Sequence, residues 1–328
     1  MSTPDPGLLV REGLCVPTAT GNKPKKILTA EQWLTLPMDT DEERIVLGSA
    51  SQPIIRTLTK NLIEGPEKSF KTSFLLRLML GVSCGLTVYS PLPVLRPRKV
   101  LYIHGELSRP EIQERTRSAV VGLKRPLDNF FQVRDLRVHL IQHDNQRHLR
   151  EIIEEVEPDD LVLDPWQSFI VGHDENEYKE VSRACAYLDR LIEDYGLTVH
   201  LATHTGKDRR RGTRGHSVLA GWRDTLTKLE RGNGQARVTV NIEPRWAAPV
   251  NPFTLEFNGG TLIEPGFTIS PFTKQAEAIR AVVTMNGGKA TREMVSQALG
   301  IGAVALRQAL KRASDSGAIK LVDEDVTL

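Results

Sequence analysis

An eight-residue stretch constrains the fold of this 328-residue chain more than any other feature. Residues 65–72 follow a short apolar run at 62–64 and open a stretch with helical spacing at 72–84. The residues of the stretch are Gly65, Pro66, Glu67, Lys68, Ser69, Phe70, Lys71 and Thr72. A loop of this type between a strand and a helix directs backbone N–H groups towards a phosphate. The pattern therefore predicts a phosphate-binding loop.

Two side chains at the end of this loop suit a bound nucleoside triphosphate. Lys71 would bridge the β- and γ-phosphates, and the Thr72 hydroxyl would take one coordination position on Mg²⁺. Phe70 departs from the pattern, because a glycine is expected before the lysine. Glycine lets the backbone approach phosphate closely, so we expect Phe70 to widen the loop or to weaken nucleotide binding. For the eight residues alone, a chance turn between a strand and a helix is the alternative.

Polar residues at the ends of later apolar runs argue against a chance turn. The run 161–163 ends in Asp164, an arrangement that orients the water shell of Mg²⁺. The run 99–104 leads to Glu106, which we interpret as the general base that polarises the attacking water. A cap for the following helix is the alternative role for Glu106. The run 198–203 leads to His204, which is placed to sense the γ-phosphate.

The spacing of apolar residues predicts how these motifs are organised. Apolar runs alternate with helical stretches, as is typical of an α/β fold with a mostly parallel sheet covered on both faces. We expect the main strands at 62–64, 99–104, 138–141, 161–163 and 198–203, with an antiparallel set after them. The expected parts are a flexible arm at 1–28, an ATPase domain with a lead-in at 29–258, a linker at 259–272 and a small domain at 273–328. Three helices followed by a hairpin in the last part predict a winged helix-turn-helix.

Composition excludes several other classes of protein. Hydrophobic residues make up 40% and charged residues 26% of the chain, as in ordinary globular proteins. The three cysteines fit neither a disulfide framework nor a zinc site, and we expect no metal other than Mg²⁺. No apolar run approaches the roughly 18 residues that a membrane span needs, and the N-terminus has no apolar signal segment. We therefore expect a cytoplasmic protein without membrane contact.

The order of these motifs resembles that of the RepA-like branch of hexameric RecA-type ATPases, AAA family proteins related to the DnaB replicative helicases. The resemblance covers roughly residues 50–258 and includes Gly215, His216, Ser217 and Asp224. It implies a RecA-like core, ATP and Mg²⁺ as cofactors, and a homo-oligomeric ring, expected to be a hexamer, with ATP at each interface. It also implies a basic residue from the neighbouring subunit, for which Arg245 is the candidate. Glu243 departs from the lysine of the family's basic pair, and a solvated surface arginine is the alternative for Arg245.

Two basic regions are candidate contacts with nucleic acid. The first directly follows His204 and contains Lys207, Arg209, Arg210, Arg211 and Arg214. In the resembling family this position is a pore loop on single-stranded DNA, and such a loop follows phosphates without reading bases. A solvated charge run is the alternative. The second region is the last helix, where Arg307, Lys311 and Arg312 are expected to dock on duplex DNA, with protein–protein contact as the alternative.

These features lead to two main hypotheses of function. The first is a Mg²⁺-ATP-dependent, ring-forming DNA motor, a replicative-type helicase that translocates on single-stranded DNA. The second is an ATP-switched replication initiator or regulator with slow or absent hydrolysis, which Phe70 and Glu243 favour. A RecA-like recombination mediator that forms filaments is a third possibility. Stimulation of ATP hydrolysis by single-stranded DNA would separate the motor from the switch.

Overall fold

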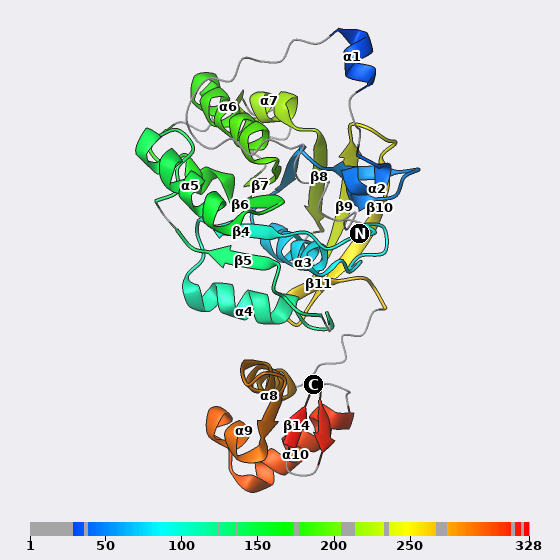
Figure 1. Ribbon diagram of the computed structural model, residues 1–328, viewed down its shortest axis with the longest axis vertical. Helices are drawn as coiled ribbons and strands as arrows, with labels where there is room; N and C mark the ends of the chain where they lie inside the picture. The colour runs from blue at the N-terminus through cyan, green and yellow to red at the C-terminus, as the bar shows by residue number, and fades with distance from the viewer. Residues whose placement is uncertain are drawn as a thin grey trace, which may run out of the picture. The chain divides into compact units, whose positions relative to one another are not determined.

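The computed structural model of the protein describes residues 29–35, 39–123, 125–135, 137–173, 177–204, 214–232, 236–266, 274–315, 319–322 and 325–327. Within these ranges, nine strands form one large sheet in the larger of two units, which extends to Glu264 (Figure 1). The strands are β3 (Lys60–Gly65), β4 (Val100–His104), β5 (Phe130–Val133), β6 (Asp160–Asp164), β7 (Thr198–His204), β8 (Thr225–Arg231), β9 (Arg237–Pro244), β10 (Val250–Asn258) and β11 (Thr261–Ile263). Their order is β11-β10-β9-β8-β3-β7-β6-β4-β5.

Most of this sheet is parallel. Strands β8, β3, β7, β6, β4 and β5 pair in parallel, whereas β9, β10 and β11 continue the sheet in antiparallel fashion at one edge. The expected α/β fold with a large, mostly parallel sheet is confirmed. A separate antiparallel pair, β1 (Ile45–Gly48) and β2 (Pro53–Arg56), precedes the sheet in the chain and follows the short helices α1 (Ala30–Leu34) and α2 (Asp41–Arg44).

Helices cover both faces of the sheet, as Figure 1 shows. Helices α5 (His143–Val156), α6 (Tyr178–Tyr195) and α7 (Arg214–Trp222) share a hydrophobic core with β4, β6 and β7 on one face. Helices α3 (Lys71–Cys84) and α4 (Arg109–Ala119) contact each other and β11 on the other face. Burial from both sides explains why β4 and β6 read as continuous apolar runs, since every residue in both strands is buried.

The parallel order brings the predicted motifs to one edge of the sheet. Gly65 at the end of β3 is in register with His204 at the end of β7. His104 at the end of β4 is in register with Asp164 at the end of β6. Because parallel strands end on the same side, the loops that follow these four strands lie close together, where ligands bind in sheets of this type.

Two expected elements differ in the structure. Residues 138–141 do not form a strand. Their apolar side chains are buried, as the sequence indicated, but in a loop in which Leu140 N donates to Phe169 O at 2.8 Å. The edge strand is β5 instead, in which Phe130 is partly buried and Phe131 is exposed, so that the sequence shows no alternating pattern. The expected linker also begins inside the sheet, because a turn at Gly259 and Gly260, both with positive φ, pairs β11 with β10.

The smaller unit includes residues 265–328. Its elements are α8 (Lys274–Met285), β12 (Lys289–Thr291), α9 (Arg292–Leu299), α10 (Ala303–Asp315), β13 (Lys320–Val322) and β14 (Asp325–Thr327). Strand β14 lies between β12 and β13 in a small antiparallel sheet. The three helices bury Ile279, Val283, Val295 and Leu310 in a core of their own. Across the described part of the chain, no helix is both long enough and apolar enough to cross a membrane.

Candidate functional site

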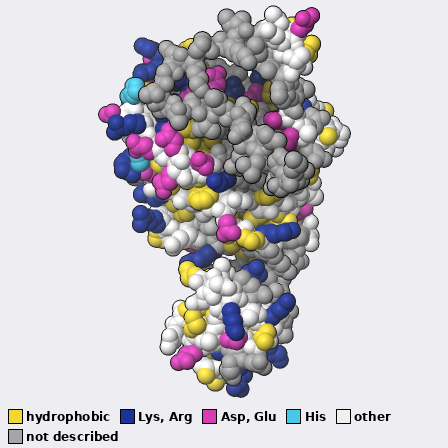
Figure 2. All heavy atoms as spheres, viewed as in Figure 1, with side chains coloured by type: hydrophobic (Ala, Val, Ile, Leu, Met, Phe, Trp, Pro, Cys, Tyr) yellow, Lys and Arg dark blue, Asp and Glu magenta, His cyan; other side chains and the backbone are white. Residues whose placement is uncertain are grey.

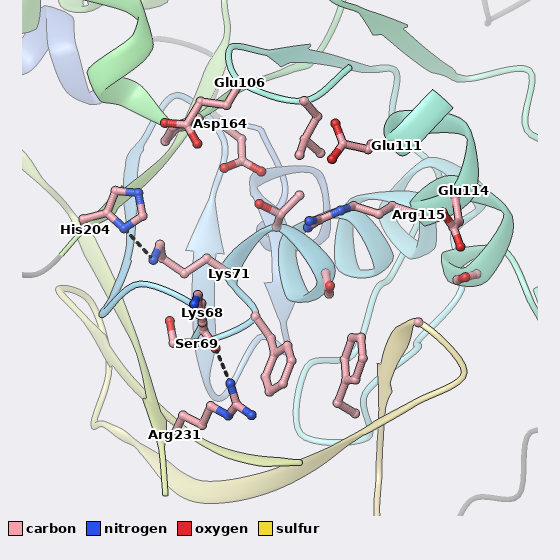
Figure 3. Close-up of a pocket in the computed structure, with 18 residues that line it drawn as sticks. Lys68, Ser69, Lys71, Glu106, Glu111, Glu114, Arg115, Asp164, His204 and Arg231 are labelled. Carbon is pink, nitrogen blue, oxygen red and sulfur yellow. Dashed lines mark hydrogen bonds between the residues drawn. The ribbon is translucent and has the colours of Figure 1, made fainter. Parts of the chain in front are cut away.

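A pocket of about 630 Å³ lies beyond the ends of β3, β4, β6 and β7 (Figure 3). Eight of the predicted site residues line it, namely Lys68, Ser69, Phe70, Lys71, Thr72, Glu106, Asp164 and His204. The side chains of Lys71, Glu106, Asp164 and His204 lie on one side of the pocket in Figure 3. The structure therefore brings together residues that lie up to 133 positions apart in the sequence.

The predicted phosphate-binding loop has the compact shape that such a function needs. Glycine is required at position 65, because an added Cβ would lie 2.5 Å from Ser69 Oγ and 2.7 Å from Leu229 O. The loop turns through Lys68 and Phe70, whose φ values of 61° and 66° are left-handed. It ends at the first turn of α3, which no side chain caps and which carries no acidic residue. The N–H groups of that turn are thus available to an anion.

Phe70 occupies the position of the missing glycine and adopts a backbone conformation that glycine favours. A left-handed backbone costs an ordinary residue on the order of 1–2 kcal/mol. The Phe70 ring stacks on Phe257 with a centroid distance of 4.4 Å and an interplanar angle of 12°. The Arg231 guanidinium lies 4.6 Å from the centroid of the same ring. Together these contacts contribute about 1–2 kcal/mol, which is enough to offset the strain. The effect of Phe70 on nucleotide affinity remains a prediction.

Lys71 is held at the centre of the pocket by the loop itself. Its Nζ donates to Gly65 O at 2.8 Å and to Pro66 O at 2.9 Å, and it lies 3.1 Å from His204 Nδ1. The residue is only 6% exposed, and burial lowers the pKa of Lys71 to about 8, against the opposing influence of Asp164, Glu106 and Glu67. Burial and the charge of Lys71 lower the pKa of His204. His204 is therefore neutral at pH 7 and can accept a hydrogen bond from the ammonium.

Asp164 is oriented by a buried tyrosine that the sequence analysis did not identify. Tyr102 Oη donates to Asp164 Oδ2 at 2.5 Å. Burial, followed by the charge of Asp164, raises the pKa of Tyr102 well above its usual value, so the phenol stays a donor. The ring of His104 stacks on Tyr102 at 4.5 Å. Tyr102 and His104 are two residues apart in β4 and therefore lie on the same face of the sheet. This spacing is the only feature of the sequence that indicated it.

Glu106 faces the pocket and does not cap α4. The cap belongs to Ser108 and Glu111, since Ser108 N and Oγ both donate to Glu111 Oε2, at 2.8 and 2.7 Å. The alternative role for Glu106 as a helix cap is therefore wrong. Gly105, the residue before Glu106, lets the chain pass close to Ser168, because an added Cβ would lie 2.3 Å from Ser168 Cβ. Glu106 itself is exposed, so its carboxylate is accessible to water in the pocket.

Several further residues, three of them basic or aromatic, line the pocket without having been predicted. Arg115 reaches into it from α4, opposite Lys71 in Figure 3. Phe257 and Arg231 line it from β10 and from the end of β8. The spacing of Glu111 and Arg115 on one helix face could have indicated the arginine. Nothing in the local sequence pointed to Phe257 or Arg231, which are more than 150 residues from the loop in the chain.

The remaining predicted residues lie outside this pocket. Arg245 is at the opposite end of the sheet, where Pro244 pairs with Thr225 at the start of β8. Its guanidinium donates to Asp224 Oδ1 at 2.8 Å. Lys207, Arg209, Arg210 and Arg211 fall outside the described residues, as does the side chain of Arg214. Arg307, Lys311 and Arg312 are exposed on α10 of the smaller unit.

The pocket fits a magnesium nucleotide by the chemistry of its donors. The Thr72 hydroxyl and the Asp164 carboxylate both line it, and Mg²⁺ prefers such oxygen ligands together with phosphate. Ser69 Oγ is buried in the loop without a hydrogen-bond partner among the described residues. Within the same residues, no cluster of three or more His, Cys, Asp or Glu side chains could hold a metal ion by itself. The magnesium would therefore take its remaining ligands from the nucleotide's phosphates and from water.

Comparison with known protein families agrees with this geometry. Residues 50–210, which include the loop, Glu106, Asp164 and His204, match the family model of the AAA domain. The loop and the polar residues at the strand ends therefore lie within a segment that is similar to AAA domains. The match does not extend to the end of the sheet or to the smaller unit, and it does not identify a helicase.

Two solved structures are similar to this chain. One is the RadB recombinase, with 15% identity, a TM-score of 0.45, and coverage of 63% of this chain and 91% of that one. The other is a KaiC-like protein from Pyrococcus horikoshii OT3, with 12% identity, a TM-score of 0.44, and coverage of 63% and 89%. The comparison with curated proteins gave no match.

The lowered pKa of Lys71 predicts that the protein takes up protons when a nucleotide binds in this pocket. Near pH 8 about half of the Lys71 side chains are uncharged, and bound phosphates would favour the ammonium form. We expect net proton uptake on ATP binding at pH 8–8.5, measured by calorimetry in buffers of different ionisation enthalpy. The affinity for ATP should fall as the pH rises above about 8. The variant Lys71→Arg stays charged and should show no such uptake; equal uptake by both proteins would contradict the assignment.

Proposed function

We propose that the chain is a Mg²⁺-ATP-dependent, ring-forming DNA motor, a replicative-type helicase that translocates on single-stranded DNA. The observation that carries the proposal is the convergence of Lys71, Glu106 and Asp164 on the N-terminus of α3. A buried lysine, an accessible carboxylate and an oriented aspartate beside free helix N–H groups are what hydrolysis of a nucleoside triphosphate needs.

The residues at the strand ends and at the start of α3 each have a part in this proposed reaction. The N–H groups of α3 and the Lys71 ammonium would bind the β- and γ-phosphates, and Thr72 and Asp164 would hold Mg²⁺. Mg²⁺, when bound, neutralises charge on the phosphate oxygens. Glu106 accepts a proton from the attacking water, which its exposed position allows. Tyr102 positions Asp164 and does not itself contact the phosphates.

The contact between Lys71 and His204 supports a link from hydrolysis to DNA. His204 is the last residue of β7, and the basic segment that begins at Lys207 follows it directly. Loss of the γ-phosphate would change the position of Lys71, and His204 would transmit that change to the start of this segment. The five basic residues there would hold the phosphates of single-stranded DNA without reading its bases.

The position of Arg245 supports a site shared between subunits. Its place at the opposite end of β8 from the phosphate-binding loop keeps it out of the pocket of its own chain. An exposed arginine at that end could enter the pocket of a neighbouring copy in a closed ring, where it would stabilise charge in the transition state. Release from Asp224 would be needed for this role.

The smaller unit supports a second contact with DNA. We propose that it is a winged helix-turn-helix, which its three helices and small antiparallel sheet support. Helix α10 buries Leu306, Leu310 and Ala313 and exposes Arg307 and Lys311. Figure 2 shows basic side chains on the visible face of this unit, with acidic side chains between them. We propose that α10 docks on duplex DNA.

A second candidate function is an ATP-switched initiator or regulator of replication that hydrolyses slowly. Phe70 favours it, because its stacking on Phe257 holds a residue other than glycine beside the phosphates. A RecA-like recombination mediator that assembles into filaments would use the same pocket. Particle shape with a non-hydrolysable ATP analogue separates a ring from a filament.

The assignment of Glu106 as general base predicts the behaviour of a pair of variants. Glu106→Gln should lower kcat for ATP hydrolysis by about 100-fold or more and should leave nucleotide binding nearly unchanged. The matched control is Glu111→Gln, since Glu111 lines the same pocket but is engaged at the start of α4. Steady-state hydrolysis and equilibrium binding measure the two effects. Loss of kcat that is equal in both variants would show that Glu106 is not the base.

The motor hypothesis predicts that single-stranded DNA stimulates ATP hydrolysis. Replacing Arg209 and Arg211 by alanine should abolish this stimulation and should reduce its dependence on salt. The matched control replaces Arg147 and Arg183, exposed arginines on α5 and α6, and should retain full stimulation. Hydrolysis assays with and without DNA over a range of salt concentrations measure the effect. No stimulation of the parent protein would favour the switch over the motor.

A further inference from the structure

Three residues from separate segments meet at the last position of the phosphate-binding loop. The ring of Phe70 stacks on Phe257 of β10, and the Arg231 guanidinium at the end of β8 lies against the same ring. Arg231 Nη1 also donates to Lys68 O at 3.1 Å, a bond drawn as a dashed line in Figure 3. The loop is thus attached at two of its residues to the antiparallel side of the sheet.

These attachments act where the loop backbone is strained. Among the described residues, positive φ values at positions other than glycine occur at Leu58, Lys68, Phe70 and Glu157, so two of the four lie in this loop. Residues in the left-handed region persist only when surrounding contacts hold them there. Arg231 binds the carbonyl group of Lys68, and the stack holds the side chain of Phe70. The contacts therefore act on both strained residues.

The anchoring residues are themselves fixed by the sheet. Phe257 N donates to Ala236 O at 2.6 Å, and Phe257 pairs with Leu262 of β11. Arg231 pairs with Val238 of β9. The sheet therefore fixes the backbone of both residues without help from the loop. Through their side chains, the sheet can hold the loop in place.

We propose that Phe70, Phe257 and Arg231 form an aromatic clamp that positions the phosphate-binding loop for the phosphates of the nucleotide. The proposal rests on the nucleotide-binding part of the proposed function. The clamp takes over the conformational role that glycine has at this position in other phosphate-binding loops. Its members are positioning residues, since they act through the backbone of residues 68–70 and the start of α3.

A competing explanation gives Phe257 a direct contact with the nucleobase. Phe257 lines the pocket, and aromatic rings bind bases by stacking. The two explanations differ for a ligand that has phosphates but no base. Inorganic tripolyphosphate should depend on the clamp as strongly as ATP does, whereas a base platform would affect ATP alone.

The first experiment measures the dissociation constants of ATP and of tripolyphosphate for Phe257→Ala. We expect both to rise by about tenfold, the size of one lost stacking contact, with kcat at saturating ATP changed by less than about twofold. Phe257→Tyr preserves the stack and should restore both affinities. The matched control is Phe253→Ala, another partly exposed aromatic on β10 that does not line the pocket, and it should bind both ligands as the parent does.

The second experiment tests whether Phe257 acts through Phe70. In a Phe70→Gly background, Phe257→Ala should weaken binding no further, because the ring it holds is gone. An unchanged affinity in Phe257→Ala, a loss confined to ATP, or a full further loss in the Phe70→Gly background would each overturn the clamp. Failure of the folded parent protein to bind either ligand would overturn the proposed function and the clamp together, and thermal unfolding of each variant verifies its fold.

Discussion

The pocket of the larger unit is arranged around one buried charged group, the Lys71 ammonium, beyond the end of β3. Taking a lysine out of water is unfavourable, and the lowered pKa of Lys71 reflects this cost. Two loop carbonyls at 2.8 and 2.9 Å offset part of it, and Asp164 and Glu106 supply opposite charge. The loop, the acids at the strand ends and the helix N-terminus all surround this one charge, so a triphosphate would complete an arrangement that is already in place.

The order of the strands determines which residues can meet Lys71. Strand β7 lies between β3 and β6, so His204 stands between the phosphate-binding loop and the strand that ends in Asp164. His204 contacts Lys71 through its side chain, and in the chain it comes shortly before the basic segment that begins at Lys207. The same sheet continues through β8 to β10, which anchor Arg231 and Phe257 against the loop. The side chains of the pocket and the residues that support its loop therefore come from one continuous sheet.

The central part of this site could be predicted from the sequence, because parallel strands that end in polar residues must bring those residues to one edge. Lys71, Thr72, Glu106, Asp164 and His204 were found in this way. Tyr102, Arg115 and the clamp residues were missed. Each acts through a contact between segments that are distant in the chain, and the spacing of nearby residues gives no sign of such a contact. The edge strand β5 and the strand β11 were missed for a related reason. An edge strand is only partly buried and lacks a continuous apolar run, and a three-residue strand is too short to show a period.

A crystal structure with Mg²⁺ and a non-hydrolysable ATP analogue would show whether the pocket binds the triphosphate of a nucleotide. We expect the β- and γ-phosphates to lie over the N-terminus of α3 and within hydrogen-bond distance of Lys71 Nζ. We also expect the metal ion near Thr72 and Asp164, with Glu106 facing the terminal phosphate. A nucleotide bound elsewhere, with Lys71 still donating only to Gly65 and Pro66, would rule out this pocket as the nucleotide site.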